Sequence, residues 1–294
     1  MNPTDKTSFL DTAPAPTLAF GIGLRRPHFD DLLNPWPGVD FLEIISENFM
    51  NFGGRPREVV KAAKERFPLI LHGVSLSIGG LDPLKEDYLE KLKALADLVD
   101  PPWFSDHLSY SSHWGVEYHD LLPLPFSEEA VEHVVARIQQ VKKVVNRPFL
   151  LENPSYYIEM PGKEMSEAEF LTEVVERADC GLLLDINNVF VNATNHGYDP
   201  YEFLGQVPAN RIRQYHMAGH DDSRSFLVDS HGSHIHPEVF KLYKHALTEV
   251  AKVWTLLEWD NAIPSLEVLL KENQLVRKAA SEALGDSFIV EVAS

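Results

Sequence analysis

The sequence predicts an α/β protein with the fold of a TIM-type (β/α)8 barrel. Eight short apolar segments recur along the 294 residues, and segments with the spacing of amphipathic helices separate most of them. Eight such units in about 250 residues fit a closed barrel better than a doubly wound sheet. No Gly-x-Gly-x-x-Gly motif leads from a predicted strand into a helix, so a dinucleotide-binding fingerprint is lacking.

The predicted strands are nearly continuous in their apolar part, which is typical of parallel strands buried on both faces. They cover Leu18–Leu24, Asp40–Ser46, Leu69–Ser75, Trp103–Tyr110, Pro148–Ser155, Gly181–Asn188, Ile212–Gly219 and Val253–Asp260. Each strand is short, as expected for a barrel of this type.

Most of the connections predict helices, because their apolar residues recur along one helical face. The predicted helices are Arg55–Arg66, Lys85–Leu98, Ser127–Val145, Ser166–Ala178, Pro237–Val250 and Pro264–Leu284. Ser166 and Glu169 have the spacing of a capping box. The first connection is short, and we expect only a helical turn over His28–Leu33.

We expect one barrel domain over residues 18–285, with a flexible tail over 1–17 and a second tail over 286–294. The N-terminal segment has neither the basic nor the apolar region of a secretory signal. A single cysteine excludes a disulfide framework, and no apolar run is long enough to span a membrane. These features predict a cytoplasmic protein that does not reside in a membrane.

The chain is strongly acidic. It has 26 Lys and Arg against 44 Asp and Glu, a formal net charge of −18, and it contains 13 histidines. This balance disfavours a nucleic-acid partner, because such binding rests mostly on Lys and Arg that neutralise phosphates. The acids and histidines form either a solvated surface or a metal site.

Polar side chains gather at the carboxyl ends of the predicted strands, where a (β/α)8 barrel has its active site. A single polar residue at a strand end could simply cap a helix or fill a barrel layer. However, six of the eight strands end in His, Asp or Glu. The sequence shows no Lys or Arg at the same strand ends. Buried carboxylates need a compensating cation, so we predict a metal site.

The ligand types restrict the metal. Imidazole and carboxylate without thiolate favour Zn, Fe or Mn. One ion takes four to six ligands, so the number of candidates predicts at least two ions and a bridging carboxylate. The strong candidates are His72, His107, Glu152, Asp185, His216, Asp229, His231 and Glu258.

Other polar residues are expected around these candidates. Asp106, Asn153, His220 and His234 are expected to contact ligands rather than to bind metal. For His220, an outer ligand and a loop residue are equal alternatives. His113 and His119 follow the fourth strand and are expected to line the mouth. Cys180, at the opposite end of the barrel, is expected to be a small buried hydrophobe.

The motifs at the strand ends resemble those of the DUF692 (UPF0276) family, the multinuclear non-heme iron-dependent oxidases. Their order and spacing over residues 18–285 are specific, although no single motif is. The matching segments are Phe41–Asn48, Leu71–Gly79, Ser105–Tyr110, Leu150–Tyr157, Leu182–Gly197, Gln214–His220, Asp229–Val239 and Leu256–Asp260. The resemblance implies a TIM-type barrel similar to xylose isomerase, in agreement with the strand count.

The resemblance also implies a ligand set. In it, His72 and His107 bind one iron, and Glu152 bridges to a second. The second iron is completed by Asp185, His216 and Glu258. A third position, not always filled, is formed by Asn188, Asp229 and His231, with Asn187 as the alternative to Asn188.

The activity that the resemblance implies is oxidation with iron, as Fe(II) and Fe(III), and O2. The substrate would be a cysteine of a ribosomally made precursor peptide, converted to a heterocycle or thioamide or changed at its β-carbon. A small partner protein that helps to deliver the leader peptide is also implied.

Three other interpretations stay open. A divalent-metal sugar isomerase or epimerase would need a Lys or second Glu for proton transfer. An endonuclease-IV-like zinc phosphodiesterase would use similar ligands, but the net charge weighs against it. A non-enzymatic metal-binding scaffold is disfavoured by the crowding of ligands at the catalytic mouth.

Overall fold

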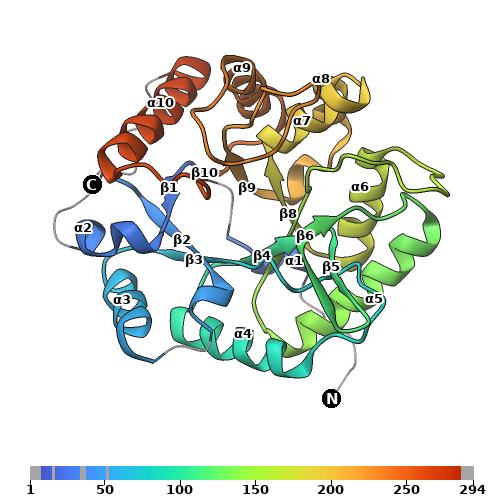
Figure 1. Cartoon of the computed structure of the whole chain (residues 1–294), viewed down its shortest axis with the longest axis horizontal. Coiled ribbons are helices and arrows are strands. Elements are labelled where there is room, and N and C mark those ends of the chain that lie inside the picture. The colour runs from blue at the N-terminus through green and yellow to red at the C-terminus, as the bar shows by residue number, and fades with distance from the viewer. Residues whose placement is uncertain (1–7, 15–16, 34–37, 51–52, 286–294) are drawn as a thin grey trace.

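A computed structural model describes residues 8–14, 17–33, 38–50 and 53–285. Eight parallel strands close into a barrel, and helices form a ring around it (Figure 1). The predicted fold is confirmed, and each predicted segment supplies one strand. The strands are β1 (Phe20–Gly23), β2 (Phe41–Ile45), β3 (Leu69–His72), β4 (Phe104–His107), β7 (Phe149–Glu152), β8 (Gly181–Asp185), β9 (Ile212–Met217) and β10 (Trp254–Leu257). They are paired in chain order, and β10 closes the barrel against β1.

The helices at the predicted positions form the ring. They are α3 (Gly54–Lys64), α4 (Glu86–Val99), α5 (Glu128–Val144), α6 (Glu167–Ala178), α9 (Pro237–His245) with a π-helical turn (Ala246–Val250), and α10 (Leu266–Leu284). The expected first turn is a 3-10 turn (Arg26–His28) followed by α2 (Phe29–Leu33). Ser166 and Glu169 form the predicted capping box at the start of α6. No described helix combines the length and apolar character that a membrane crossing requires.

The sixth predicted strand, Gly181–Asn188, is too long. β8 ends at Asp185, whose carboxylate accepts a hydrogen bond of 2.7 Å from the backbone N–H of Asn188 and so caps α7 (Ile186–His196). The apolar run continues from the strand into the helix, and this continuity hides the boundary. Neither α7 nor the following α8 (Pro200–Gln206) was among the predicted helices.

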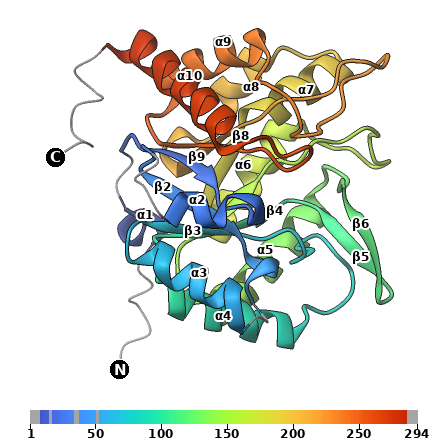
Figure 2. The same cartoon turned by 60° about the vertical axis from the view of Figure 1, so that its left-hand side comes forward.

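A two-stranded antiparallel hairpin beside the mouth of the barrel was not predicted. It consists of β5 (Tyr110–His113) and β6 (Val116–Leu122), and its register is interrupted by a bulge. In Figure 2 the hairpin and the N-terminal helix α1 lie on opposite sides of the barrel. The fourth barrel strand therefore ends at His107, three residues before the predicted end.

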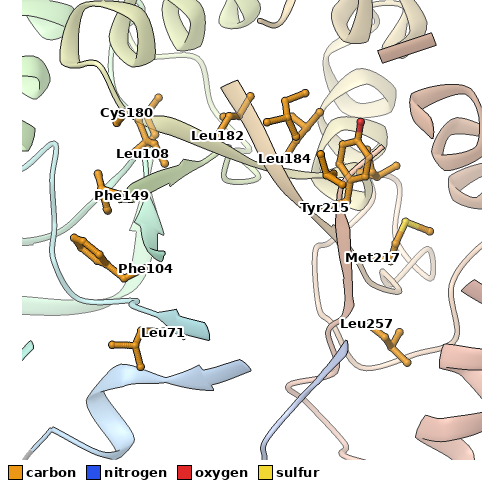
Figure 3. Packing of buried hydrophobic residues seen from close by; sticks show 14 of the residues in the cluster. Leu71, Phe104, Leu108, Phe149, Cys180, Leu182, Leu184, Tyr215, Met217 and Leu257 are labelled. Carbon is orange, nitrogen blue, oxygen red and sulfur yellow. The ribbon is translucent and has the colours of Figure 1, made fainter. Parts of the chain in front are cut away.

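Side chains alternate between the barrel interior and the outer layer of helices, as the period of a strand requires. Leu182 and Leu184 of β8 pack outward with Cys180 (Figure 3), whereas Leu183 lies in the inner cluster. Cys180 is buried, as expected. Because Asp185 follows Leu183 by two residues, its carboxylate lies in the interior above an apolar layer.

The same alternation operates in the other strands. The inner apolar cluster contains Phe9, Ala13, Ala19, Phe41, Ile70, Trp103, Leu150, Leu183 and Leu256. Two residues after Ile70, Leu150 and Leu256, the chain places His72, Glu152 and Glu258. The interior is therefore apolar at the amino ends of the strands and polar at their carboxyl ends.

Part of the predicted N-terminal tail is a structural element. Helix α1 (Phe9–Thr12) lies under the barrel, and Phe9 joins the inner cluster with 4% of its surface exposed. The backbone N–H of Phe9 donates to the Asp179 carboxylate (3.0 Å), and the Arg213 guanidinium lies 5.1 Å from the centre of its ring. A side chain at Gly181 would collide with that ring at 2.3 Å. Residues 1–7 and 286–294, which were also predicted as tails, lie outside the described residues.

Truncation of the Phe9 side chain tests this closure. Phe9→Ala should lower the free energy of unfolding by about 3 kcal/mol, because it removes a buried ring and leaves a cavity. Leu10→Ala is the matched control, since Leu10 belongs to the same helix and is 41% exposed. Chemical denaturation measures both variants. Equal stability of the two would show that Phe9 does not close the barrel.

Candidate metal centre

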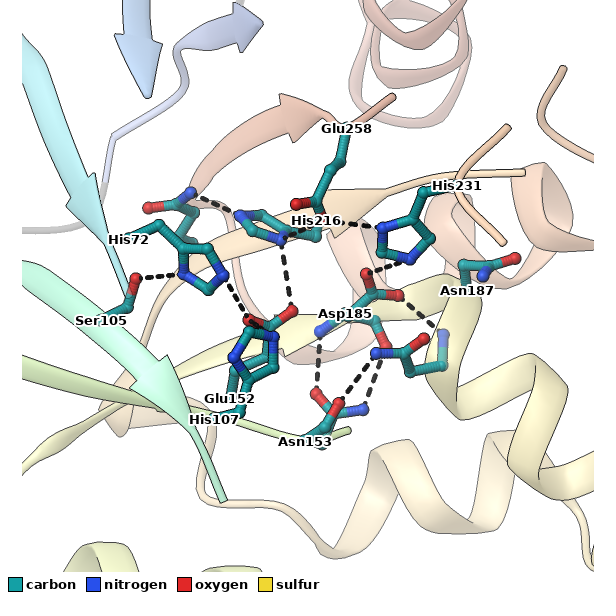
Figure 4. A network of polar contacts seen from close by, with 12 residues as sticks. His72, Ser105, His107, Glu152, Asn153, Asp185, Asn187, His216, His231 and Glu258 are labelled. Atoms are coloured by element: carbon teal, nitrogen blue, oxygen red, sulfur yellow. Dashed lines mark hydrogen bonds and ion pairs between the residues drawn. The ribbon is translucent and has the colours of Figure 1, made fainter. Parts of the chain in front are cut away.

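Six of the predicted ligands come together in the barrel interior, at the carboxyl ends of the strands (Figure 4). Five are the final or near-final residues of β3, β4, β7, β8 and β9, and the sixth directly follows β10. All six are buried, and none is more than 8% exposed. They are His72, His107, Glu152, Asp185, His216 and Glu258.

The first group of potential ligand atoms consists of His72, His107 and Glu152, whose donor atoms lie within 4.8 Å of one another. The Nε2 atoms of His72 and His107 are 3.4 and 3.2 Å from Glu152 Oε2. The Nδ1 atoms are occupied elsewhere: His72 Nδ1 contacts Ser105 Oγ (2.8 Å), and His107 Nδ1 contacts the Gly73 carbonyl (3.2 Å). Both rings therefore present Nε2 to a shared centre.

The second group consists of Glu152, Asp185, His216 and Glu258, again within 4.8 Å. His216 Nδ1 is 3.2 Å from Glu152 Oε1 and 2.9 Å from Glu258 Oε2. Glu152 thus belongs to both groups, with Oε2 facing the first and Oε1 facing the second. This is the position of a carboxylate that bridges two ions.

A third group surrounds His231, on the loop after β9. Its Nε2 is 2.7 Å from Asp229 Oδ1, and its Nδ1 is 3.2 Å from Glu258 Oε2. His231 also has a backbone φ of +45°, which is strained for a non-glycine residue and common at functional sites. Asp260 completes this group, although it was not among the predicted ligands.

The geometry distinguishes Asn188 from Asn187. Asn188 lines the same cavity as His231 and Asp229, and its Oδ1 accepts a hydrogen bond from Ser155. Asn187 is fully buried, donates to Asp229 (2.9 Å) and is not among the residues that line this cavity. Asn188 is therefore the better placed of the two to contact an ion.

An arginine reaches the ligands from the end of β1, a strand end at which no ligand was predicted. Arg25 follows β1, and its guanidinium pairs with Asp260 (2.5 Å) and more distantly with Glu258 (3.7 Å). Gly23 makes room for it, since a Cβ there would lie 2.5 Å from the guanidinium. One buried cation does not balance the carboxylates of the three groups.

Several atoms of the two inner groups are buried but make no hydrogen bond of normal geometry within the described chain. They are His72 Nε2, Glu152 Oε2, Asp185 Oδ2 and His216 Nδ1. Leaving such atoms unsatisfied costs about 1–3 kcal/mol each. All four belong to the groups where ligand atoms converge, so the residues fit a metal centre with nitrogen and oxygen donors.

The shifted pKa values of the buried ligands also indicate a site for cations. Burial raises the pKa of Asp185 well above its usual range, although His231 opposes the shift. Burial lowers the pKa of His216, but Glu43, Glu258 and Glu152 outweigh this effect and raise it well above its usual range. The site therefore attracts positive charge strongly, which a metal cation supplies.

Three of the four residues expected around the ligands contact the segments that carry them. Asp106 accepts hydrogen bonds from the backbone of His107 (2.8 Å) and Leu76 (3.2 Å). Asn153 binds the backbone of Asp185 through both ends of its amide (2.8 and 3.1 Å). His220 Nδ1 contacts Asn187 Oδ1 at 2.8 Å.

His234 does not contact the site. Its Nδ1 pairs with Glu272 of α10 at 2.6 Å, and 69% of its side chain is exposed. Because His234 is close to His231 in the sequence, it was expected to contact the ligands. The loop instead directs its side chain toward Glu272.

A cavity of about 500 Å³ opens above the ligands. Its floor includes His72, His107 and Glu258, and one wall is formed by Glu117 and His119 of the hairpin. His119 thus lines the mouth as expected. His113 lies instead in a separate groove of about 420 Å³ between the hairpin and α5.

Glu43 is a buried residue that sequence reasoning missed. Its side chain is fully buried in the barrel and lies 3.2 Å from His216 Nε2. The sequence did contain a signal for Glu43. Both faces of the apolar strand Phe41–Ile45 are buried, so a Glu within it has to be a buried carboxylate.

Comparison with known proteins gives one family match over most of the chain. Residues 19–281 match the family described as RiPP precursor modification enzyme MbnB/TglH/ChrH. A UPF0276 protein of Anaeromyxobacter sp. (strain Fw109-5) is 48% identical over 91% of this chain and 94% of its own length. A UPF0276 protein of Caulobacter vibrioides is 49% identical over 88% of this chain and 92% of its own length.

The similar solved structures share the barrel. L-ribulose 3-epimerase aligns with a TM-score of 0.62 at 12% identity, covering 94% of this chain and 98% of that one. The 3-keto-D-glucoside 4-epimerase YcjR of E. coli aligns with a TM-score of 0.57 at 14% identity, covering 89% and 100%. These identities are low, so the alignments show a fold of the xylose isomerase type and carry no information on activity.

Loss of one ligand should remove metal without unfolding the barrel. His107→Ala should lower the bound metal by about one ion per chain, since a site deprived of one of its few protein ligands binds weakly. Elemental analysis and circular dichroism measure the two effects. His245→Ala, on α9 and outside the site, is the control. Unchanged metal content in His107→Ala would refute the assignment of His107.

Proposed function

Because the chain belongs to the family of RiPP precursor modification enzymes MbnB/TglH/ChrH, we propose that it is a multinuclear non-heme iron oxidase. It would use O2 to modify cysteine residues of a ribosomally made precursor peptide. The observation that carries the proposal is Glu152, whose two oxygens face two separate groups of nitrogen and oxygen donors.

The donor set fits iron. Imidazole and carboxylate without thiolate are ligands of Fe(II) and Fe(III) in non-heme sites. Bound iron would activate O2, the oxidant that accepts the electrons removed from the cysteine. Two ions would be held by His72, His107, Glu152, Asp185, His216 and Glu258, and a third by Asn188, Asp229 and His231.

The protein's own residues would bind and orient the substrate. The cavity of about 500 Å³ reaches the ligands from the mouth, so a cysteine side chain can enter while the rest of its peptide stays outside. At the amino ends of the strands the interior is apolar and includes Phe9, and this apolar floor restricts water to one side of the site.

The reacting cysteine would belong to another chain. Cys180, the single cysteine, is buried outside the barrel, and burial raises the pKa of its thiol to about 12. It is therefore a poor nucleophile and a poor metal ligand. We further propose that a small partner protein helps to deliver the leader peptide and that the reaction takes place in the cytoplasm.

Sugar epimerisation has weaker support. It needs a carboxylate or Lys free to move a proton. No Lys lines the described cavity. Glu152 and Glu258 each face histidines of the metal groups, and Glu117 in the cavity wall pairs with Lys85. A phosphodiesterase would also need a basic surface, which a net charge of −18 does not favour.

Reconstitution tests the proposed activity. Protein loaded with iron without oxygen should, after O2 is admitted, change the mass of a cysteine-containing peptide encoded beside its gene. Mass spectrometry should place the change at cysteine, and a Cys-to-Ser peptide should stay unchanged. Glu152→Gln should abolish the reaction, because the shared ligand is altered.

Two results would contradict the proposal. One is a stoichiometric content of zinc or magnesium in the purified protein without any redox change in its optical spectrum. The other is an unchanged peptide mass with iron-loaded protein and partner present.

A further inference from the structure

A row of polar side chains leads from the ligand His216 into the barrel interior beneath the metal groups. It consists of Trp103, Gln214, Glu43 and His216, none of them more than 1% exposed. Glu43 comes from β2 and Gln214 and His216 from β9, while Trp103 immediately precedes β4. Polar groups so deeply buried are retained where their hydrogen bonds are satisfied and specific.

The orientation of the Gln214 amide follows from Trp103. The indole Nε1–H can only donate, and it donates to Gln214 Oε1 at 2.8 Å. The other end of the amide, Nε2, therefore points away from Trp103 and donates to Glu43 Oε2 at 2.6 Å. This bond holds the Glu43 carboxylate against His216.

The carboxylate in turn selects a tautomer of His216. Glu43 Oε2 is 3.2 Å from His216 Nε2, and a carboxylate can only accept. If His216 Nε2 donates its hydrogen to Glu43, a metal-bound His216 directs the lone pair of Nδ1 toward Glu152 and Glu258. Gln214 Nε2 is also 3.0 Å from His216 Nε2. Without Glu43, the amide is placed to donate to that atom and to favour the opposite tautomer.

We infer that Glu43, held by Gln214 and Trp103, is a positioning residue that commits His216 to bind metal through Nδ1. The inference rests on the metal centre proposed above. His216 would differ in this respect from His72 and His107, which present Nε2 because Ser105 and Gly73 hold their Nδ1 atoms. Carboxylates behind a histidine ligand typically change metal affinity by about 10–100-fold.

Replacement of Glu43 tests whether this residue positions His216 or only contributes to the stability of the fold. Glu43→Met keeps a similar volume and removes the acceptor, so it should weaken the second ion by about 10–100-fold. The first ion, at His72, His107 and Glu152, should keep its affinity. Anaerobic competition of Fe(II) with a chromogenic chelator gives both affinities, and elemental analysis gives the stoichiometry. Glu43→Gln retains an acceptor oxygen and should fall between wild type and Glu43→Met.

Glu272 provides a matched control. It is another buried glutamate paired with a histidine, His234, but it lies outside the metal groups. Glu272→Met should leave both Fe(II) affinities unchanged. A second readout identifies the nitrogen directly: long-range ¹H–¹⁵N spectra of zinc-loaded wild-type protein should show His216 bound through Nδ1 with hydrogen on Nε2.

The outcomes are distinct. Equal affinities in wild type and Glu43→Met, equal weakening of both ions, or zinc on Nε2 of His216 would each overturn the inference while leaving the metal centre in place. A wild-type chain that binds no ion would overturn both. If circular dichroism shows that Glu43→Met does not fold, Gln214→Met removes the bond that holds Glu43, and selective weakening of the second ion is again expected.

Discussion

The structure depends on one electrostatic constraint: carboxylates and imidazoles converge inside the upper layer of a barrel with few protein cations to balance them. Burial of a carboxylate costs several kcal/mol unless it is paired. Arg25 offsets part of the charge near Asp260. The remaining negative charge and the unsatisfied ligand atoms fit metal ions, and the surrounding contacts hold the ligand atoms close together.

The two inner groups differ in charge. The first has two imidazoles and a share of Glu152, whereas the second has one imidazole together with Glu152, Asp185 and Glu258. Two similar ions would therefore experience unequal fields. If both positions were filled, the second would favour the ion of higher charge.

Much of this arrangement was predictable, because continuous apolar runs mark buried parallel strands and polar residues at their ends mark the mouth. The errors have physical reasons. The apolar run through Asp185 crosses from strand into helix, and its boundary is set by a cap rather than by a change in hydrophobicity. The hairpin strand β6 is largely exposed, so it has no buried run to reveal it.

Contacts between distant segments could not be predicted from local patterns. Arg25 meets Asp260 across 235 residues, and Gln214 meets Glu43 across 171. These pairs form only because the barrel closes, and neither residue alone indicates its partner. His234 shows the opposite error, since its closeness to His231 along the chain does not bring it to the site.

The closure of the barrel floor has a consequence for the order of folding. Ser8 binds Asp179, 171 residues later in the chain, and Phe9 packs against residues of β7 and β8. Contacts between such distant residues form slowly, because a long loop must close before they stabilise the chain. During synthesis, α1 is made well before Asp179 and β8, the segments that form its docking surface. Until those segments exist, the ring of Phe9 has no surface to pack against, so α1 cannot dock before β7 and β8 are made.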